Sequence, residues 1–359
     1  MKLFLIGGFL GSGKTTAIQQ AGTSLLNHGR KVAVITNDQG SDLVDTGYME
    51  SFGIATREVP NGCFCCNYEQ LVRSVSSLVE TEKPELIFAE SVGSCTDLVA
   101  TIAKPMAKFQ PRIEIVISVF ADAALLYSLV NGTSSFINDA VRYIFKKQLQ
   151  EADILIINKI DLLNETGLNA VRRLIDIDCP GKTVLYQDSL EQQDVQQWLA
   201  AMENFSLTNN RTTLELDYDI YAAGEAMMGW LDESLDIFTV EPFAYDAALL
   251  LIWKIENEIR GKGYFIGHLK FLIDDGITNN KISFTAIPVS DNVQHEDYPA
   301  TNKVSLLINV RVQADASVIK QVVSLAIDET VEQTGCQVVE HKLSSFQPGY
   351  PTPTYRFQD

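Results

Sequence analysis

The chain opens with an apolar stretch that runs into a glycine-rich loop and then into a helical pattern. The stretch KLFLIG, residues 2–7, runs into GGFLGSGKTT, residues 7–16, in which Gly8, Gly13, Lys14 and Thr15 fit the pattern G-x-x-x-x-G-K-[ST]. A strand before the loop and a helix after it are the context that this phosphate-binding motif requires. Because glycine permits the tight turn, the backbone amides of the loop converge on a phosphate at the positive end of the helix. The opening therefore predicts a nucleotide-binding α/β domain.

The residues of this loop have separate expected roles. Lys14 reaches the β and γ phosphates, and the Thr15 hydroxyl binds Mg²⁺. A glycine-rich turn without a ligand is the alternative. The predicted phosphate-contacting set is Gly8, Gly11, Ser12, Gly13, Lys14, Thr15 and Thr16.

Strand-like apolar runs alternate with helical patterns through residues 1–204, which we take as one domain. Strands that are apolar throughout are buried on both faces, so the alternation predicts a P-loop α/β fold with a mostly parallel sheet covered by helices on both faces. Strands are expected at residues 2–7, 31–36, 85–89, 113–120, 153–158 and 182–186, and helices near 14–27, 68–81, 97–108, 136–150 and 164–176.

The pattern changes after residue 204. Residues 205–234 are polar and acidic and indicate a linker or crossing segment. Residues 235–345 indicate a smaller C-terminal α+β domain of the ferredoxin-like type. Residues 346–359 form a proline-rich tail that is expected to be extended or irregularly packed. In the C-terminal domain we expect strands at 235–240, 265–273, 281–287, 304–312 and 337–343, and helices at 245–260 and 316–333.

The tetrapeptide NKID ends the apolar run DILIIN and contains Asn158, Lys159 and Asp161. An asparagine can bond the N7 and O6 edge of a purine, and a carboxylate can accept both N1–H and the exocyclic amino group, a combination that guanine has and adenine lacks. A helix-capping turn is the alternative. Because the tetrapeptide lies at the carboxyl end of a strand downstream of a phosphate loop, it predicts GTP as the nucleotide.

Acidic residues follow two other strands. Glu90 ends the run ELIFAE, and Gly93 follows at the spacing of the D-x-x-G element of switch GTPases. Glu90 is expected to hold Mg²⁺ through water, and the Gly93 amide to meet the γ-phosphate and order the loop behind it. Asp38, Asp42 and Asp45 form either a solvated loop face or ligands to a second metal. The candidate catalytic residues are Lys14, Thr15, Glu90 and Asp38.

Half of the six cysteines lie in the hexapeptide GCFCCN, residues 62–67. Cys63, Cys65 and Cys66 can direct three sulfurs at one soft cation if the backbone turns at Gly62. Thiolates suit Zn²⁺ and Cu⁺, and an incomplete site that takes its fourth ligand from elsewhere suits transfer better than permanent structure. Buried apolar cysteines and redox chemistry are the alternatives. The cysteines at 95, 179 and 336 are expected in the core, although the one at 95 follows Gly93 closely enough to approach the nucleotide.

The composition excludes several partners. The chain has 28 lysines and arginines against 46 aspartates and glutamates, a net charge of −18. Such a surface repels nucleic acid and anionic lipid headgroups, so neither is an expected partner. Apolar runs fall short of the roughly 20 residues that cross a bilayer. Clustered cysteines that cannot form an unstrained disulfide framework indicate reduced thiols and a cytoplasmic location.

The segments GGFLGSGKTT, NDQG, EVPNGCFCCN, ESVG and NKID occur in the order and at the spacings of one family. In these segments the chain resembles the CobW-type GTPases, relatives of the UreG and HypB nickel-enzyme maturation factors. The resemblance covers about residues 1–200, with a weaker match at RGKG, residues 260–263. It implies a GTP-hydrolysing metal chaperone whose C-x-C-C thiols bind Zn²⁺, Co²⁺ or a similar ion. Asp38 departs from the family, which usually has glutamate after this asparagine.

The leading hypothesis is a switch in which GTP and Mg²⁺ order the loops at residues 37–46 and 90–97, and thereby change the metal affinity of the neighbouring cysteines. These segments lack an obvious arginine finger or catalytic glutamine, so slow turnover is expected. The C-terminal domain is expected to recognise a client metalloprotein that the sequence does not name. One alternative is a GTP-controlled assembly factor for a cofactor enzyme with a structural zinc site, and another is a small-molecule kinase.

Overall fold

The computed structural model describes residues 1–40, 44–132, 138–206, 211–288 and 300–359. They form two compact units. Unit 1 contains Met1–Gln39, Phe52–Gly224 and Tyr350–Asp359, and unit 2 contains Gly40–Ser51 and Glu225–Gly349. The chain therefore passes from unit 1 into unit 2 twice and returns each time.

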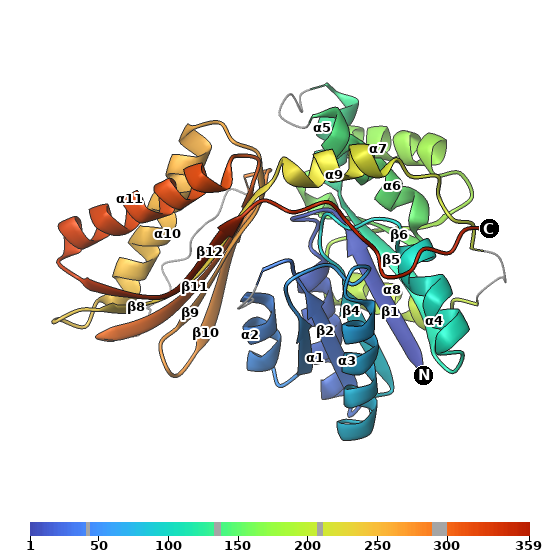
Figure 1. Ribbon diagram of the computed structural model, residues 1–359, viewed down its shortest axis with the longest axis horizontal. Helices are drawn as coiled ribbons and strands as arrows, with labels where there is room; N and C mark the ends of the chain where they lie inside the picture. The colour runs from blue at the N-terminus through green and yellow to red at the C-terminus, as the bar shows by residue number, and fades with distance from the viewer. Residues whose placement is uncertain (41–43, 133–137, 207–210, 289–299) are drawn as a thin grey trace. The chain divides into compact units, whose positions relative to one another are not determined.

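Unit 1 is built on a seven-stranded sheet of order β3-β2-β4-β1-β5-β6-β7 (Figure 1). Every neighbouring pair in it is parallel. The one strand of this sheet that the sequence patterns did not predict is β3, because its adjacent charged residues Arg57 and Glu58 suit a half-buried edge rather than the sheet centre. The strands are β1 (Lys2–Gly8), β2 (Val32–Asn37), β3 (Ala55–Val59), β4 (Leu86–Glu90), β5 (Glu114–Asp122), β6 (Ile154–Asn158) and β7 (Thr183–Gln187).

Helices cover both faces of this sheet (Figure 1), which confirms the predicted α/β fold. The sequence patterns did not predict two short helices, α2 (Val44–Ser51) and α5 (Ala123–Val130), or the helices α8 and α9. The expected helix at 97–108 is instead one π-helical turn followed by a short α-helix. The helices outside unit 2 are α1 (Lys14–Asn27), α3 (Tyr68–Thr81), η1 (Val99–Ala103), α4 (Lys104–Phe109), α5 (Ala123–Val130), α6 (Asp139–Glu151), the 3₁₀ turn η2 (Ile160–Leu162), α7 (Glu165–Asp178) and α8 (Gln192–Asn204); α9 (Tyr218–Ala226) runs from unit 1 into unit 2.

The sheet direction brings all the predicted motifs of unit 1 to one edge. The phosphate loop follows β1, Asn37 ends β2, the cysteines follow β3, Glu90 ends β4 and Asn158 ends β6. Carboxyl ends of parallel strands share one edge of the sheet, where ligands of such folds bind. The strand order places β3, β2, β4 and β1 side by side, so the cysteine loop and the phosphate loop are separated by two strands only.

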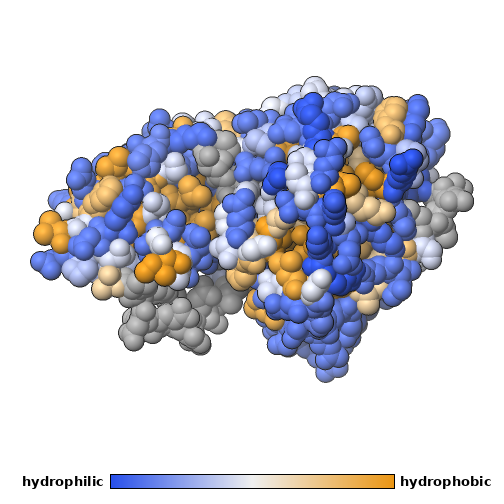
Figure 2. Space-filling model, turned by 90° about the horizontal axis from the view of Figure 1, so that it is seen from below, coloured by the Kyte–Doolittle hydropathy of each residue, from blue (hydrophilic) through white to orange (hydrophobic). Residues whose placement is uncertain are grey.

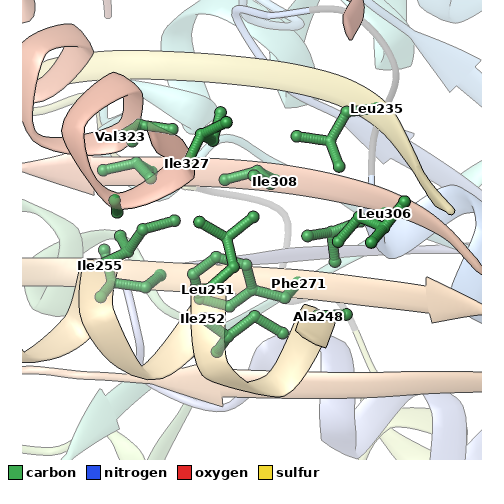
Figure 3. Packing of buried hydrophobic residues seen from close by; sticks show 14 of the residues in the cluster. Leu235, Ala248, Leu251, Ile252, Ile255, Phe271, Leu306, Ile308, Val323 and Ile327 are labelled. Atoms are coloured by element: carbon green, nitrogen blue, oxygen red, sulfur yellow. The ribbon is translucent and has the colours of Figure 1, made fainter. Parts of the chain in front are cut away.

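Unit 2 has an antiparallel sheet of order β10-β9-β11-β8-β12. Without the edge strand β10, the succession β8-α10-β9-β11-α11-β12 and its order match the predicted ferredoxin-like pattern. Leu251 and Ile255 of α10 (Ala244–Gly261) and Ile327 of α11 (Ala316–Thr334) pack on the sheet around Phe271 (Figure 3). The elements are α2 (Val44–Ser51), β8 (Gly229–Phe238), α10 (Ala244–Gly261), β9 (Ile266–Asp274), β10 (Asn279–Phe284), β11 (Lys303–Val312), α11 (Ala316–Thr334) and β12 (Gln337–Phe346).

Strand β8 begins at Gly229 rather than at residue 235, so the acidic start of the strand was wrongly assigned to the crossing segment. Asp232 is 4% exposed, and its carboxylate pairs with the buried Arg311 guanidinium at 2.7 Å. A carboxylate can lie inside a strand when such a partner offsets the cost of burial. The polar sequence therefore misled the strand assignment.

On the face shown in Figure 2, hydrophilic residues predominate and exposed hydrophobic residues lie in separate groups. This agrees with the net charge of −18. Among the helices that the structure describes, none has the length and apolar character needed to span a membrane.

Candidate nucleotide site and thiolate metal site

The phosphate loop after β1 has a backbone that only glycine allows at two places. Gly8 has φ 126°, and a Cβ there would lie 2.2 Å from the Phe120 carbonyl oxygen. Gly13 has φ 91°, and its Cβ would lie 2.2 Å from Asn158 Nδ2. Gly11 also has a positive φ, 73°. The loop therefore takes the shape expected of the motif because side chains are missing where the chain turns.

The polar side chains of the loop are buried and directed inward. The Lys14 ammonium donates to the Gly8 carbonyl at 2.7 Å and to the Phe9 carbonyl at 3.2 Å, so the lysine folds back over the loop. The Ser12 hydroxyl is 1% exposed and has no hydrogen-bond partner within the described residues. A buried hydroxyl of this kind suits a ligand oxygen. Thr16 is half-buried in the first turn of α1.

Thr15 and Glu90, predicted as magnesium residues, meet in the structure. The Thr15 hydroxyl donates to Glu90 Oε1 at 2.9 Å, and both side chains are 6% exposed. A hydroxyl and a carboxylate are the oxygen donors that Mg²⁺ takes beside nucleotide phosphates. The donor set therefore fits the predicted ion.

The NKID residues hold the loops around the predicted base site. Asn158 Nδ2 donates to the Ser12 carbonyl at 2.8 Å, and its oxygen accepts from the Ser189 amide and hydroxyl at 3.0 and 2.8 Å. Lys159, at φ 62°, pairs with Asp122 at 2.8 Å. The pKa of Asp161, whose side chain is mostly exposed, is raised by partial loss of solvation and then by the Asp188 charge. Asn158 thus joins the phosphate loop to the loop after β7, and its contact with a purine stays a prediction.

Gly93 lies directly against the phosphate loop. A Cβ on Gly93 would lie 2.9 Å from the backbone nitrogen of Leu10. Gln148 of α6 donates to the carbonyls of Gly93 at 3.0 Å and of Cys95 at 2.8 Å. The Ser91 amide donates to the Ile6 carbonyl at 2.9 Å. Residues 91–95, which we call the linking segment, are therefore held by β1 at Ser91, by the phosphate loop at Gly93 and by α6 at Gly93 and Cys95.

The three cysteines of the hexapeptide converge as predicted. Their sulfurs are 2.7 Å (Cys63–Cys65), 3.2 Å (Cys63–Cys66) and 3.8 Å (Cys65–Cys66) apart. Among the described residues, these three cysteines form the group of side chains that could hold a metal ion. Hydrogen bonds from the neighbouring thiols, that of Cys65 first, hold the pKa of Cys63 well below its usual range, and the hydrogen bond with Cys63 raises the pKa of Cys66 to about 11. One thiolate with protonated neighbours is a ready ligand for a soft cation.

Asn37, at the end of β2, shapes the cysteine loop. Its amide nitrogen donates to the carbonyls of Val59 and Gly62, both at 2.7 Å, and its oxygen accepts from the Phe64 amide at 2.9 Å. Asp38 continues this link, because its carbonyl accepts from the Gly62 amide at 3.3 Å. The beginning of the loop that we predict to sense the nucleotide, residues 37–46, is thus hydrogen-bonded to the cysteine loop, residues 62–67.

The C-terminal tail also reaches the cysteine loop, which the sequence did not suggest. The Thr354 amide donates to the Cys65 carbonyl at 2.9 Å, and its hydroxyl donates to the Cys66 carbonyl at 3.0 Å. Two residues on, the Arg356 guanidinium pairs with the fully buried Asp97 at 2.6 Å. The tail is extended, as predicted, and it packs on unit 1.

Two of the predicted acidic residues belong to different units. Asp38 is half-buried directly after β2 in unit 1, whereas Asp45 lies in α2 of unit 2. Asp45 is paired with Lys270 and Lys281; burial opposes its ionisation, but the two ammonium groups hold its pKa well below its usual range. The reading of Asp45 as a solvated loop residue is wrong, and its lysine pairs make it a structural ion. Asp42 lies outside the described residues.

The prediction that Cys95 is simply a core residue is incomplete. Its side chain is 1% exposed, but it hydrogen-bonds to the sulfurs of both Cys63 and Cys65. Cys179 and Cys336 are buried, as expected. The sequence signal for Cys95 was its position two residues after Gly93, which only the fold relates to the cysteine loop.

Comparisons with known proteins agree with this geometry. The family model of the CobW/HypB/UreG nucleotide-binding domain matches residues 2–186. A Sinorhizobium protein named zinc chaperone CobW is 29% identical over 193 residues, covering 47% of this chain and 53% of that protein. The Escherichia coli protein named zinc chaperone YeiR is 31% identical over 176 residues, covering 47% of this chain and 49% of that one.

Among solved structures, HypB from Helicobacter pylori in complex with nickel aligns with a TM-score of 0.42 at 17% identity, covering 58% of this chain and 91% of that one. The chain spans about half the length of the curated relatives it matches. Because the family model covers more than half of its residues, with the phosphate loop and the cysteine loop inside the match, this chain belongs to the CobW/HypB/UreG family.

Proposed function

We propose that this protein is a GTP-hydrolysing metal chaperone or insertion factor, in which Cys63, Cys65 and Cys66 hold the cation that it transfers. The observation that carries the proposal is the connection between the two loops. Asn37 bonds the cysteine loop from the strand that leads into the nucleotide-sensing loop, and the linking segment lies against the phosphate loop. When two loops share such contacts, a ligand bound at one loop changes the ligand affinity of the other.

The nucleotide side of the proposal rests on the phosphate loop and its neighbours. Lys14 and the Ser12 hydroxyl meet the phosphates, and Thr15 with Glu90 holds Mg²⁺, which would neutralise charge on the transferred phosphoryl group. Asp38 remains the candidate for orienting the attacking water. We infer a slow intrinsic rate, since the segments at the site lack an obvious arginine finger.

Guanine selectivity is part of the proposal. Asn158 and Lys159 support it, because they lie at the carboxyl end of β6 and Asn158 bonds the phosphate loop, while the Asp161 side chain is exposed. An exposed carboxylate at this edge is available to accept N1–H and the amino group of guanine. Preference for ATP would instead favour a small-molecule kinase.

Zinc is the first cation that we propose, because relatives of this chain are named zinc chaperones and three thiolates suit Zn²⁺. The three-sulfur cluster fits an ion held for delivery, since it leaves coordination positions open. The second candidate is an assembly factor in which the same cysteines hold a permanent structural zinc. The client and cytoplasmic residence stay predictions.

A competitive zinc titration distinguishes the two candidates. The protein is titrated against a chromophoric chelator without nucleotide, with GDP and with a non-hydrolysable GTP analogue, each with Mg²⁺. We expect the zinc affinity to differ at least about tenfold between the two nucleotides, since allosteric couplings are typically about 1–3 kcal/mol. By reciprocity, zinc should change the GTP-analogue affinity by the same factor.

Cys65→Ala is the matched variant, and the ATP analogue is the control for the base. The variant should lose zinc binding and keep GTP binding. Equal zinc affinities in all nucleotide states, with zinc retained through hydrolysis, would favour the structural-zinc candidate.

A further inference from the structure

Four sulfurs, rather than three, gather at the cysteine loop. The Cys95 side chain hydrogen-bonds to the sulfurs of Cys63 and Cys65, although it comes from a different loop, the one that follows β4. Its backbone is held independently of its side chain, because its amide donates to the Val92 carbonyl at 3.0 Å and its carbonyl accepts from Gln148 at 2.8 Å. The sulfur is therefore aimed at the cluster by backbone contacts.

Three of the four sulfurs form a tight group. Cys63, Cys65 and Cys66 have sulfurs that all lie within 4.8 Å of one another, and Cys95 is not part of that tight group. Because the Cys95 side chain already hydrogen-bonds to Cys63 and Cys65, it can supply the fourth thiolate. Tetrahedral Cys₄ coordination is one of the standard arrangements for zinc.

The linking segment joins this fourth sulfur to the phosphate loop. Gly93 approaches the backbone of Leu10 so closely that a Cβ would lie 2.9 Å from its nitrogen. Gln148 bonds the carbonyls of Gly93 and Cys95 together at 3.0 and 2.8 Å. Only one residue separates Gly93 from Cys95, so a shift of the glycine toward or away from a γ-phosphate moves the cysteine as well.

We propose that Cys95 is the fourth thiolate ligand of the cation at the cysteine loop, and that the linking segment brings it into or out of coordination. This inference rests on the proposed metal chaperone function and names the ligand which that function leaves open. On binding, the Cys95 thiol loses its proton to solvent and its sulfur bonds the cation. With Cys95 bound the cation is closed in by four sulfurs; with Cys95 withdrawn a position opens for a client ligand.

Cobalt(II) is the probe, because absorption by sulfur-to-cobalt charge transfer reports the number of thiolates and the visible bands report the geometry. Co²⁺ and Zn²⁺ are titrated into the full chain and into Cys95→Ser, Cys65→Ser and Cys179→Ser. Cys179 is the matched control, since it is also buried but lies at the end of α7. Each titration is done without nucleotide, with GDP and with a non-hydrolysable GTP analogue.

We expect Cys95→Ser to weaken Co²⁺ and Zn²⁺ binding at least about 100-fold in the nucleotide state that binds tightest, since a ligand of a four-coordinate zinc site carries a large share of its affinity. The charge-transfer absorption should fall and the nucleotide effect on metal affinity should shrink. Cys179→Ser should leave all three unchanged.

A Cys95→Ser protein that matches the unchanged protein in spectrum, affinity and nucleotide effect, while Cys65→Ser loses binding, would overturn the role of Cys95 and leave the proposed function standing. Failure of the unchanged protein to bind either ion would instead contradict the proposed function. Thermal unfolding of each variant, with Cys95→Ala as a second substitution, shows whether lost binding reflects lost folding.

Discussion

The phosphate loop and the cysteine loop lie at the same edge of one sheet, but they are held in opposite ways. The turn of the phosphate loop is formed by bonds within the loop, from Ser12 to Phe9 at 3.2 Å and from Lys14 to the Gly8 carbonyl, and Asn158 and Glu90 bond to the finished turn. The cysteine loop depends on residues far along the chain, with Asn37 removed by 25 positions from Gly62 and Thr354 by 288 from Cys66. The first loop takes its turn from local bonds, whereas the second is assembled from distant ones.

This difference teaches where regulation can act. A loop that bonds to itself keeps its shape when the rest of the chain moves, as a nucleotide pocket requires. A loop held by remote groups changes when those groups move, which suits a cation that must be bound and then released. The following substitutions test this division, beginning with the largest expected effect.

Lys14→Ala should reduce GTP hydrolysis by roughly 1000-fold, because the ammonium stabilises charge that develops on the phosphates. Zinc affinity without nucleotide should stay within about twofold, since the lysine ammonium donates to the Gly8 and Phe9 carbonyls of its own loop. Phosphate release and zinc competition measure the two effects. The exposed Lys83→Ala, at the turn after α3, is the control. A large loss of nucleotide-free zinc binding would break the division.

Arg356→Met should lower the free energy of unfolding by about 3 kcal/mol, because it leaves the fully buried Asp97 carboxylate without its guanidinium partner. The tail that carries Thr354 should then become sensitive to limited proteolysis. Urea unfolding checks the first effect, and Arg73→Met, on the exposed face of α3, is the control. Comparable loss of GTP and zinc affinity would show that the tail supports both loops.

Asn37→Ala should weaken zinc binding about tenfold and cost about 2 kcal/mol of stability, since two hydrogen bonds to the cysteine loop and one to the end of β3 are lost. GTP affinity should change less, because none of those bonds reaches the phosphate loop. Zinc competition and fluorescent-nucleotide binding are measured side by side, with the exposed Asn204→Ala as control. Equal losses at both sites would contradict the assembled nature of the cysteine loop.

Glu151 sets a pH dependence behind the linking segment. Burial, and then the Asp97 charge, raise the pKa of Glu151 to about 7, while its carboxylate accepts from Thr96 Oγ1 and the Val99 amide and lies near Lys182. A raised carboxyl pKa means that stability is lost as the pH rises from about 4.3 to about 7. The protonated form is the one that the fold favours.

Glu151→Gln should remove this decline, worth about 3 kcal/mol across that range. Urea unfolding at intervals from pH 4.5 to 8 measures it, with the exposed Glu165→Gln as control. Parallel pH profiles of the variant and the unchanged protein would show that Glu151 is not the group responsible.

Much of unit 1 was predictable because its signals are local. Helices α1 and α3 have the predicted bounds, and six of the seven strands were located from apolar runs. The sequence patterns gave the wrong element where the burial of a residue depends on a partner far along the chain. Asp232 has the sequence character of a linker residue, and only its pairing with Arg311 explains its place in a strand. The polar residues of β3 are explained by its position at the edge of the sheet. In unit 2 the order of strands and helices was predicted, but the sequence offered no chemistry there.

The amino-acid sequence by itself determined the phosphate loop, the NKID turn and the cluster of Cys63, Cys65 and Cys66, because each depends on residue types a few positions apart. Only the tertiary structure decided that Asn37, Thr354 and Cys95 meet at that cluster. These contacts form when strands β2 and β4 and the C-terminal tail are brought to one edge of the sheet, and no local pattern records which distant loops a parallel sheet places side by side.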